Sequence, residues 1–321
     1  MNSKLYKPSN PSVWSGRIDS ETDYDQFRYH QIVKCTELKE MTDGNGNEVS
    51  ILGFESDIGV ERNGGRIGAV KGPDYFRKNI GSLCWHGDPG GFIDAGNIKP
   101  ERDLKAAQHE LGKAVFFLLE KKKRPFIIGG GHETAFGHFK GIADFLNKHD
   151  PEAKPGILNI DAHFDLRSYE SGAHSGSSFL QAHDYALEKE LDLKYFVYGI
   201  NSDNNTRHLF NKANDLGAIY CTNQEIFQHE PEALQKLRNF LQSRTHIYLT
   251  VCLDVFLSAI APGVSAPAWN GIMLSHAQKV FDIVKKSGML MSMDVCELNP
   301  EYDEHGKTAR VAGTLFSELV R

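Results

Sequence analysis

The sequence predicts an α/β protein built on a parallel sheet that helices cover on both faces. Along most of the 321 residues, short β-rich runs alternate with longer segments whose apolar residues have helical spacing. Strands separated by helix-length segments form βαβ units, and such strands run parallel. No Pro-, Ser- or Gly-rich linker, low-complexity tract or repeat interrupts the pattern. A single domain over residues 46–321, preceded by an N-terminal arm over residues 1–45, is therefore the simplest interpretation.

The elements follow in order. The arm is polar and predicted to be irregular, and Ile51 to Phe54 is a predicted strand that runs into the Gly-rich loop IGVERNGGRIGAVKGP. Ala106 to Leu119 has apolar residues at helical spacing, and the basic stretch KKKR ends this helix where cations suit its dipole. The remaining pattern predicts strands at 126–128, 157–161, 195–200, 246–254 and 289–294, and helices near 134–148, 206–214, 231–243 and 275–287.

Composition excludes several classes of protein. An apolar fraction of 40%, a charged fraction of 24% and 30 glycines are typical of a globular chain rather than a disordered or fibrous one. With 36 basic and 42 acidic residues the net charge is −6, so we expect neither nucleic acid nor a membrane surface as a partner. The N-terminal residues lack the apolar run of a secretory signal, and no window is apolar enough to span a membrane, which predicts a cytoplasmic protein.

The cysteine pattern bears on disulfide bonds and on structural zinc. The five cysteines are odd in number, widely spread and not grouped in CxxC pairs, which argues against a disulfide framework and against a structural zinc site.

In parallel sheets, ligands gather at the carboxyl ends of the strands, and four predicted strands end in chemically active residues. GGGHE, residues 129–133, places His132 after a tight glycine turn, although a turn with an incidental histidine would look the same. NIDAHFDLR sets Asp161, His163 and Asp165 at alternate positions, which share one face while the chain stays extended. Burying two carboxylates and an imidazole together calls for a cation, whereas a solvated acidic turn would not.

Two later strands end in the same way. CLDVF offers Asp254 and, two residues earlier, Cys252, and the rigid loop APGVSAP follows. MDVCELNP offers Asp294 and Glu297 after another buried strand. Four strand tips that each supply acids or a histidine form a much stronger signal than any single motif.

These motifs, in this order and spacing, resemble those of the arginase-like ureohydrolases, and the resemblance covers residues from about 50 to the end. Within that superfamily the sequence is most similar to the formimidoylglutamase family, which hydrolyses N-formimidoyl-L-glutamate to L-glutamate and formamide in histidine degradation. The narrower similarity rests on GVERNGGRIGAVKGP, on HETAFGH in place of the DHS usual in arginases, and on LDVF running into APGVSAP.

The resemblance implies a three-layer α/β/α fold with a central, mostly parallel sheet of about eight strands, and two manganese ions bridged by hydroxide. By position it implies six metal ligands: His132, Asp161, His163, Asp165, Cys252 and Asp254. Cys252 stands where most members have a bridging aspartate. A thiolate is softer than a carboxylate, so the second manganese site would be weakened or changed, unless Cys252 is an inert, buried side chain.

A second departure is Phe179, which stands where arginases have a histidine proton shuttle; His174 nearby could substitute for it or be an exposed loop residue. The resemblance makes Asp165 the proton acceptor for the nucleophile and gives Glu297 the cationic amidinium, with Asp294 as a support behind the site, although Glu297 and Asp294 could be structural instead. Of the loop residues Arg62, Asn63 and Arg66, we expect Asn63 and Arg66 to bind the substrate carboxylates.

Two other functions stay open at this stage. One is a ureohydrolase that releases urea from a guanidine such as arginine or agmatine. The other is a non-catalytic relative that keeps the fold and binds a ligand, which the aspartate lost at Cys252 makes conceivable. The resemblance also implies a small-molecule substrate and a homo-oligomer.

Overall fold

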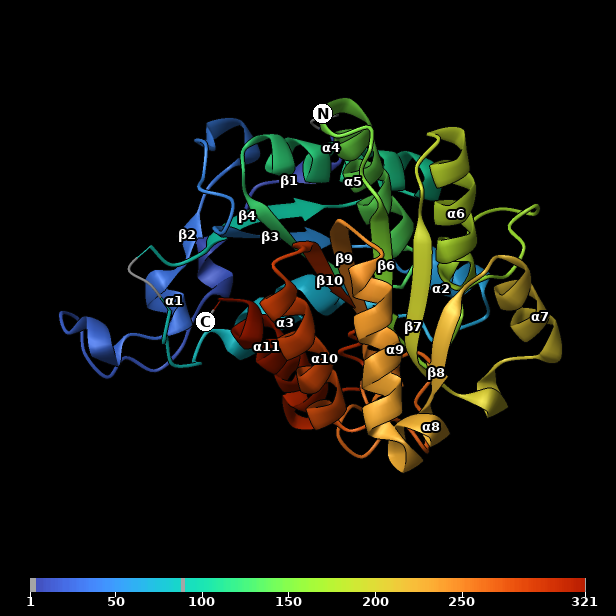
Figure 1. The fold of residues 1–321 in the computed structure, drawn as a ribbon. Coiled ribbons are helices and arrows are strands. Elements are labelled where there is room, and N and C mark those ends of the chain that lie inside the picture. The colour runs from blue at the N-terminus through green and yellow to red at the C-terminus, as the bar shows by residue number, and fades with distance from the viewer. Residues whose placement is uncertain (1–3, 88–89, 321) are drawn as a thin grey trace.

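The structure is a computed structural model that describes residues 4–87 and 90–320 (Figure 1). Within these residues ten strands form one sheet in the order β1-β4-β3-β5-β10-β9-β6-β7-β8, with β2 also paired to β4. The eight longer strands all pair in parallel. They are β3 (Val49–Phe54), β4 (Ile93–Ile98), β5 (Arg124–Gly129), β6 (Pro155–Ile160), β7 (Lys194–Ile200), β8 (Ile219–Thr222), β9 (His246–Cys252) and β10 (Leu290–Cys296).

Helices cover both faces of this sheet. Apolar side chains of one strand alternate between two cores, as Ile51 and Leu52 do, because successive residues of a strand point to opposite faces. One core holds residues of α4 (Leu104–Glu120), α5 (Thr134–His149), α6 (Ser178–Glu188) and α7 (Arg207–Asp215). The other holds residues of α3 (Gly72–Ile80), α8 (Asn223–Gln228), α9 (Glu230–Gln242), α10 (Leu274–Ser287) and α11 (Lys307–Val320). The predicted three-layer fold with about eight parallel strands is confirmed.

The N-terminal arm is mostly irregular, as predicted, but it is tied to the edge of the sheet. Strands β1 (Tyr6–Lys7) and β2 (Lys34–Cys35) both pair with β4, and the short helix α1 (Tyr29–Ile32) lies between them in sequence. The indole N–H of Trp14 donates to Asp94 at 2.7 Å, where Asp94 also receives two guanidinium hydrogen bonds of 2.8 Å from Arg77. Residues 1–3 of the arm lie outside the described residues.

The pattern missed some elements and misplaced some ends. Strand β4 was not predicted because its sequence, IDAGNI, carries polar residues and a glycine; in the structure Arg77 neutralises its buried Asp94. The predicted strand 246–254 ends at Cys252, where a 3-10 turn (Leu253–Val255) takes over, and the strand predicted at 289–294 continues to Cys296. Strand β8 and helices α3, α6, α8 and α11 were also not predicted, and the short helix α2 (Ile58–Arg62) lies within the predicted Gly-rich loop.

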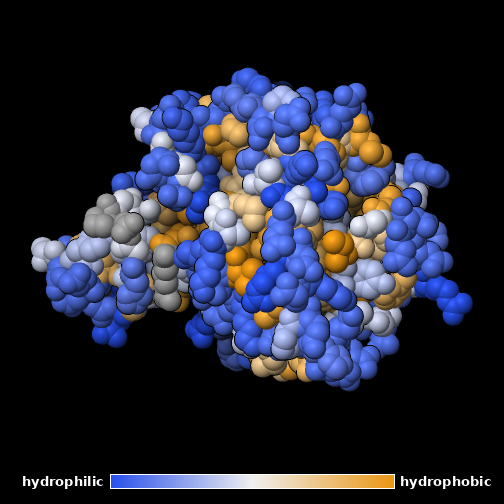
Figure 2. Space-filling view, viewed as in Figure 1, coloured by the Kyte–Doolittle hydropathy of each residue, from blue (hydrophilic) through white to orange (hydrophobic). Residues whose placement is uncertain are grey.

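Hydrophilic residues cover most of the face shown in Figure 2, with hydrophobic side chains visible between them. No helix within the described residues is long and apolar enough to cross a membrane. All five cysteines are free, and the sequence had argued against a disulfide framework.

The four strands with chemically active ends are neighbours at the centre of the sheet, in the order β5-β10-β9-β6. Their last residues are aligned: Ile128 pairs with Val295, Val295 with Val251, and Val251 with Ile160. Because parallel strands in register end at one edge, the loops that follow must meet there. The fold therefore brings the four motifs together.

Candidate active site

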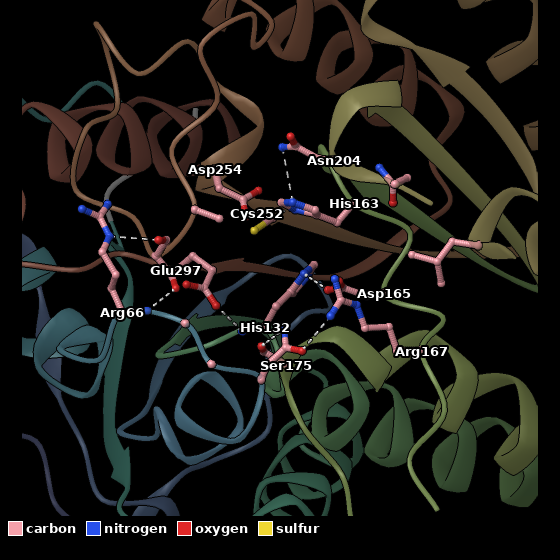
Figure 3. Close-up of a pocket in the computed structure, with 17 residues that line it drawn as sticks. Arg66, His132, His163, Asp165, Arg167, Ser175, Asn204, Cys252, Asp254 and Glu297 are labelled. Atoms are coloured by element: carbon pink, nitrogen blue, oxygen red, sulfur yellow. Dashed lines mark hydrogen bonds and ion pairs between the residues drawn. The ribbon is translucent and has the colours of Figure 1, made fainter. Parts of the chain in front are cut away.

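The four loops enclose a cavity of about 300 Å³ at the carboxyl edge of the sheet (Figure 3). Among the described residues, five of the six predicted metal ligands line it, together with Glu297 and with residues of the Gly-rich loop; the sixth ligand, Asp161, is fully buried beside them. The lining residues are Asn63, Gly64, Gly65, Arg66, His132, His163, Asp165, Arg167, Ser175, Asn204, Asn205, Leu209, Cys252, Asp254, Ser265, Ala266 and Glu297.

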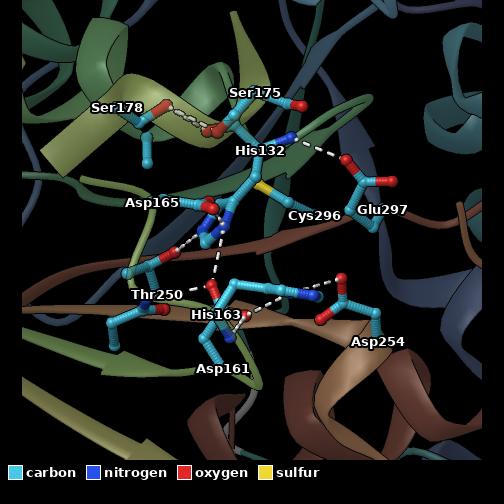
Figure 4. Close-up of polar contacts among 12 residues, drawn as sticks. His132, Asp161, His163, Asp165, Ser175, Ser178, Thr250, Asp254, Cys296 and Glu297 are labelled. Atoms are coloured by element: carbon cyan, nitrogen blue, oxygen red, sulfur yellow. Dashed lines mark hydrogen bonds and ion pairs between the residues drawn. The ribbon is translucent and has the colours of Figure 1, made fainter. Parts of the chain in front are cut away.

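His132 is held at four points. Its Nδ1 atom lies 3.0 Å from Asp161 Oδ2 and 2.9 Å from Asp165 Oδ2, while Nε2 lies 3.0 Å from Thr250 Oγ1 (Figure 4). Its backbone N–H donates to Glu297 Oε1 at 3.0 Å, and its carbonyl accepts from Ser178. The ring therefore turns Nδ1 toward the two carboxylates and Nε2 toward the sheet.

His163 occupies the opposite side of Asp161. Its Nδ1 atom lies 3.5 Å from Asp161 Oδ1 and 3.2 Å from Asp254 Oδ2. Each oxygen of Asp161 thus faces a different histidine. Two groups of ligand atoms share this aspartate, and within each group the atoms lie within 4.8 Å of one another: His132, Asp161 and Cys252 in one, Asp161, His163 and Asp254 in the other.

The predicted convergence of Asp161, His163 and Asp165 is present, but an extended chain does not produce it. Strand β6 ends at Ile160, and the chain then turns, with Asp165 in the left-handed region at φ 49°. Phe164, within this turn, is buried and packs edge-on against Phe210. Glu297 also has a positive φ, of 70°. Such conformations are costly for residues other than glycine, and they cluster at functional sites.

Burial and charge strongly shift the acid–base behaviour of these groups. Burial alone would lower the pKa of His132, but the carboxylates of Asp161 and Asp165 outweigh it, so this pKa lies well above its ordinary value. The pKa of His163 is raised in the same way, against its burial, by Asp254 and Asp161. Burial, together with the nearby carboxylates of Asp254 and Glu133, raises the pKa of Glu297 to about 8. The cluster therefore binds protons where a cation would fit.

Unpaired atoms within the described residues support the same reading. Neither Asp254 Oδ1 nor Glu297 Oε2 has a hydrogen-bond partner there, although both are buried. Buried polar atoms are normally paired, so two unpaired carboxylate oxygens from residues that line one cavity fit a bound cation. Carboxylate and imidazole donors suit a divalent cation such as manganese, and the two groups that share Asp161 suit a pair of such ions. The residues fit the predicted metal centre.

Cys252 is placed to complete one of the two groups, since its side chain lines the cavity and is 2% exposed. Burial, and then the carboxylates of Asp161 and Asp254, raise the pKa of its thiol well above the usual value. Without a cation the thiol is therefore protonated, and ligation would require the cation to displace that proton. Whether Cys252 ligates stays a prediction.

A second layer of polar side chains lies beneath the ligands, and sequence reasoning found only one member of it. Asn159, Thr250 and Asp294 pair in register across β6, β9 and β10. Asn159 Nδ2 donates to Asp161 Oδ2 at 3.0 Å, and Thr250 bonds His132. Because each sits two residues before a strand tip, its side chain shares the face of the residue at that tip.

Asp294, predicted as a support behind the site, lies in this layer. It does not line the cavity, and it bonds His138 Nδ1 at 2.7 Å and the hydroxyl of Tyr248. His138 Nε2 in turn lies 2.5 Å from Ser292 Oγ. The second histidine of HETAFGH is therefore part of the buried network behind the site rather than a ligand facing the cavity.

The two residues of the Gly-rich loop that were predicted to bind the substrate, Asn63 and Arg66, both line the cavity but make different contacts. Asn63 lines the cavity, and its Nδ2 atom donates to Ser175 Oγ at 3.2 Å. Arg66 also lines it, but its guanidinium donates to the carbonyls of Ser265, at 3.0 Å, and Val264, and stacks 3.9 Å from the ring centre of Tyr302. These contacts commit Arg66 to holding the loop, so its binding to a substrate carboxylate stays a prediction.

Arg62 is directed elsewhere: it donates to the carbonyl of Ala173 and does not line the cavity. Arg167 is a lining residue that sequence reasoning missed. Its Nη1 atom lies 3.4 Å from Asn63 Oδ1, and it has no carboxylate partner within the described residues. Figure 3 shows Arg66 and Arg167 at opposite margins of the labelled group. The sequence could have suggested Arg167 as a lining residue, because it follows Asp165 by two residues in the same motif.

Phe179 and His174 take different places. Phe179 is buried, with its ring 5.2 Å from that of His132 and stacked on Tyr195 at 4.7 Å, so this position packs against the site and cannot carry protons. His174 bonds the carbonyl of Ser168 at 3.1 Å and does not line the cavity.

Residues 47–321 match the Arginase family. The chain is 37% identical over 320 residues to formimidoylglutamase from Lysinibacillus sphaericus, covering 98% of this chain and 97% of that protein. It is 38% identical over 320 residues to formimidoylglutamase from Ralstonia nicotianae, with the same coverage. The crystal structure of formiminoglutamase from Trypanosoma cruzi with Mn²⁺ is similar at a TM-score of 0.77 and 25% identity, covering 91% of this chain and 97% of that chain.

Proposed function

Because the chain belongs to the arginase family, as its match over residues 47–321 shows, we propose that it hydrolyses N-formimidoyl-L-glutamate to L-glutamate and formamide. The relatives that share 37% and 38% identity over 98% of the chain carry the name of this activity. The observation in the molecule that carries the substrate choice is the charge pattern of the cavity. Of its lining acids, Asp165 and Asp254 are predicted metal ligands and Glu297 is the predicted binding site of the amidinium. The arginines that line it are Arg66 and Arg167.

This pattern favours a substrate with a cationic amidine at one end and carboxylates at the other. Arg167 offers a planar guanidinium that is not paired with a carboxylate within the described residues, and Asn63 lies beside it. Arginine guanidinium binds carboxylates in a bidentate manner. The ammonium group of arginine, and the free amine of agmatine, would find no acid among the described lining residues away from the base of the cavity.

We infer that His132, Asp161, His163, Asp165, Cys252 and Asp254 hold two manganese ions, and the solved relative with Mn²⁺ supports this choice of metal. When bound, such a pair lowers the pKa of a shared water toward neutrality and so supplies a nucleophile. The chain's own residues must then position the amidine and move the proton. Occupancy of the second site depends on Cys252.

Asp165 is suited to the proton transfer. It lies 2.9 Å from His132 Nδ1 and also lines the cavity, so it reaches both the ligand group and the substrate space. We assign it the proton of the attacking water, which it passes to the glutamate nitrogen as the C–N bond breaks. The new C–O bond yields formamide, and the protonated nitrogen leaves as the amine of L-glutamate.

Glu297 is suited to the amidinium. One of its oxygens accepts from the backbone N–H of His132, while the other is buried and unpaired among the described residues. Burial and the neighbouring carboxylates raise its pKa, so a cation bound beside it would stabilise its ionised form. A cationic amidine bound there would therefore be tied to the same loop that holds the metal ligand His132.

The test is formamide release from N-formimidoyl-L-glutamate with and without added manganese, alongside urea release from arginine and agmatine and elemental analysis. We expect manganese-dependent formamide and no urea. Urea without formamide would assign a guanidine substrate, and no turnover at full metal occupancy would assign a binding protein. The matched variant is Asp165→Asn, for which we expect turnover to be lost even when excess manganese restores the metal content that elemental analysis measures. The cytoplasmic location and the homo-oligomer stay predictions.

A further inference from the structure

Glu133, the residue directly after His132, is buried, and one oxygen of its carboxylate bonds the segment that leads into the Gly-rich loop. It is 0% exposed, and its Oε1 atom accepts a hydrogen bond of 2.8 Å from the backbone N–H of Gly59 and one of 2.9 Å from Ser56 Oγ. Gly59 lies in the first turn of α2 (Ile58–Arg62). The carboxylate therefore fixes the start of this helix, although the helix is 74 positions away in sequence.

Two glycines make room for this contact. A Cβ atom on Gly59 would lie 2.7 Å from Glu133 Cδ, and one on Gly131 would lie 2.0 Å from Glu133 Oε2. Atoms do not approach that closely without displacement, so a side chain on either glycine would displace the carboxylate from its present position. Its fit between the GGGHE loop and α2 is thus specific in shape as well as in hydrogen bonding.

Helix α2 leads straight into the cavity wall, since Asn63 is its next residue and 63–66 all line the cavity. The rest of this loop is held at its far end. Asp57 Oδ2 accepts from the backbone N–H of Gly68 at 2.8 Å, and Asn299 Nδ2 donates to the carbonyls of Arg66 and Ile67 at 3.1 Å. Glu133 supplies the corresponding hold at the near end.

We propose that Glu133 is a positioning residue for substrate recognition, which fixes segment 63–66 relative to the metal ligand His132 by bonding the first turn of α2. Because the ligand and this anchor are consecutive residues, a single peptide unit relates the metal site to the substrate-binding loop. This role rests on the proposed function for its substrate.

Two conservative variants separate reach from charge. Glu133→Gln keeps the length and the Oε1 acceptor, whereas Glu133→Asp keeps the charge but is one methylene too short to reach Gly59. For Glu133→Asp we expect KM for N-formimidoyl-L-glutamate to rise about tenfold, the loss expected for one buried hydrogen bond, with kcat within about threefold and manganese content unchanged. Glu133→Gln should keep KM within about threefold of wild type. The same substitutions at Glu120, on the end of α4, are the matched controls.

Hydrogen exchange of the amides of residues 59–68 gives a readout that does not need turnover. We expect faster exchange there in Glu133→Asp and wild-type exchange in Glu133→Gln. The proposal is overturned if Glu133→Asp matches wild type in KM and exchange, if Glu133→Gln loses as much as Glu133→Asp, or if the loss tracks manganese content. If wild type releases no formamide, the proposed function fails, but the exchange comparison still decides whether Glu133 positions the loop.

Discussion

Thr250 Oγ1 lies 3.0 Å from His132 Nε2, on the side of the ring opposite the two aspartates. This contact orients the imidazole so that Nδ1 faces Asp161 and Asp165. Groups behind a metal-binding histidine set its tautomer and orientation, and their loss typically costs about 10- to 100-fold in metal affinity. We therefore expect Thr250→Val, which keeps the shape but removes the hydroxyl, to weaken manganese binding by about tenfold or more.

Thr250→Ser keeps the hydroxyl and should stay within about threefold of wild type in manganese affinity. Calorimetric titration of the metal-free protein with manganese measures both variants. Equal affinities for Thr250→Val and wild type would show that the hydroxyl does not orient His132.

Cys252 is the one predicted ligand whose chemistry departs from the rest. Manganese prefers carboxylate oxygen to thiolate sulfur, and burial beside two carboxylates keeps the thiol protonated. We expect Cys252→Asp to bind the second manganese at least about tenfold more tightly, and Cys252→Ala to bind it more weakly. The measurement is metal stoichiometry by elemental analysis, with spin-coupled signals in electron paramagnetic resonance reporting the ion pair. An unchanged stoichiometry in both variants would make Cys252 an inert buried side chain.

Arg167 carries the second substrate prediction. Arg167→Ala should raise KM for N-formimidoyl-L-glutamate by about 10- to 100-fold, because a charge-assisted hydrogen bond contributes roughly 1.5–3 kcal/mol. Arg167→Lys should have a KM between those of wild type and Arg167→Ala, since lysine keeps the charge but lacks the planar guanidinium that binds a carboxylate through two hydrogen bonds. Steady-state kinetics measures this, with Arg238→Ala as the control because Arg238 is exposed on α9 and does not line the cavity. A KM unchanged in Arg167→Ala would remove Arg167 from the substrate site.

The strand tips were predictable from the sequence because their signal is local. His132, Asp161, Asp254 and Glu297 each follow a short apolar run by one to four residues, and parallel strands must end at one edge. The structure brings them together as predicted. What could not be predicted is the path of the chain past those ends, as with the left-handed turn at Asp165.

Contacts between side chains of loops that are distant in sequence could not be predicted either. Arg66 was predicted to bind a substrate carboxylate and Arg167 was not, and only packing shows that Arg66 donates to the carbonyls of 264–265, about 200 positions away, while Arg167 lines the cavity. In the same way β4 was missed because its Asp94 is neutralised by Arg77 from α3. A pattern of polar and apolar residues carries no information about such pairs, since it does not say which charges meet inside the fold.

The Arg77–Asp94 pair gives the acid dependence of stability. Burial would raise the pKa of Asp94, but the Arg77 guanidinium outweighs it and holds this pKa below its ordinary value. The ionised carboxylate therefore stabilises the fold above the unfolded-state pKa, and that stability is lost as pH falls through the lower, folded value. Asp94→Asn removes the buried ionic partner of Arg77 and leaves it the exposed Asp74, 3.3 Å away, so it should lower the free energy of unfolding by about 3 kcal/mol at pH 7, with a smaller deficit near pH 3. Urea unfolding of both proteins across this range measures it, and a deficit that does not change with pH would show that the carboxylate's charge is not what stabilises the arm and β4.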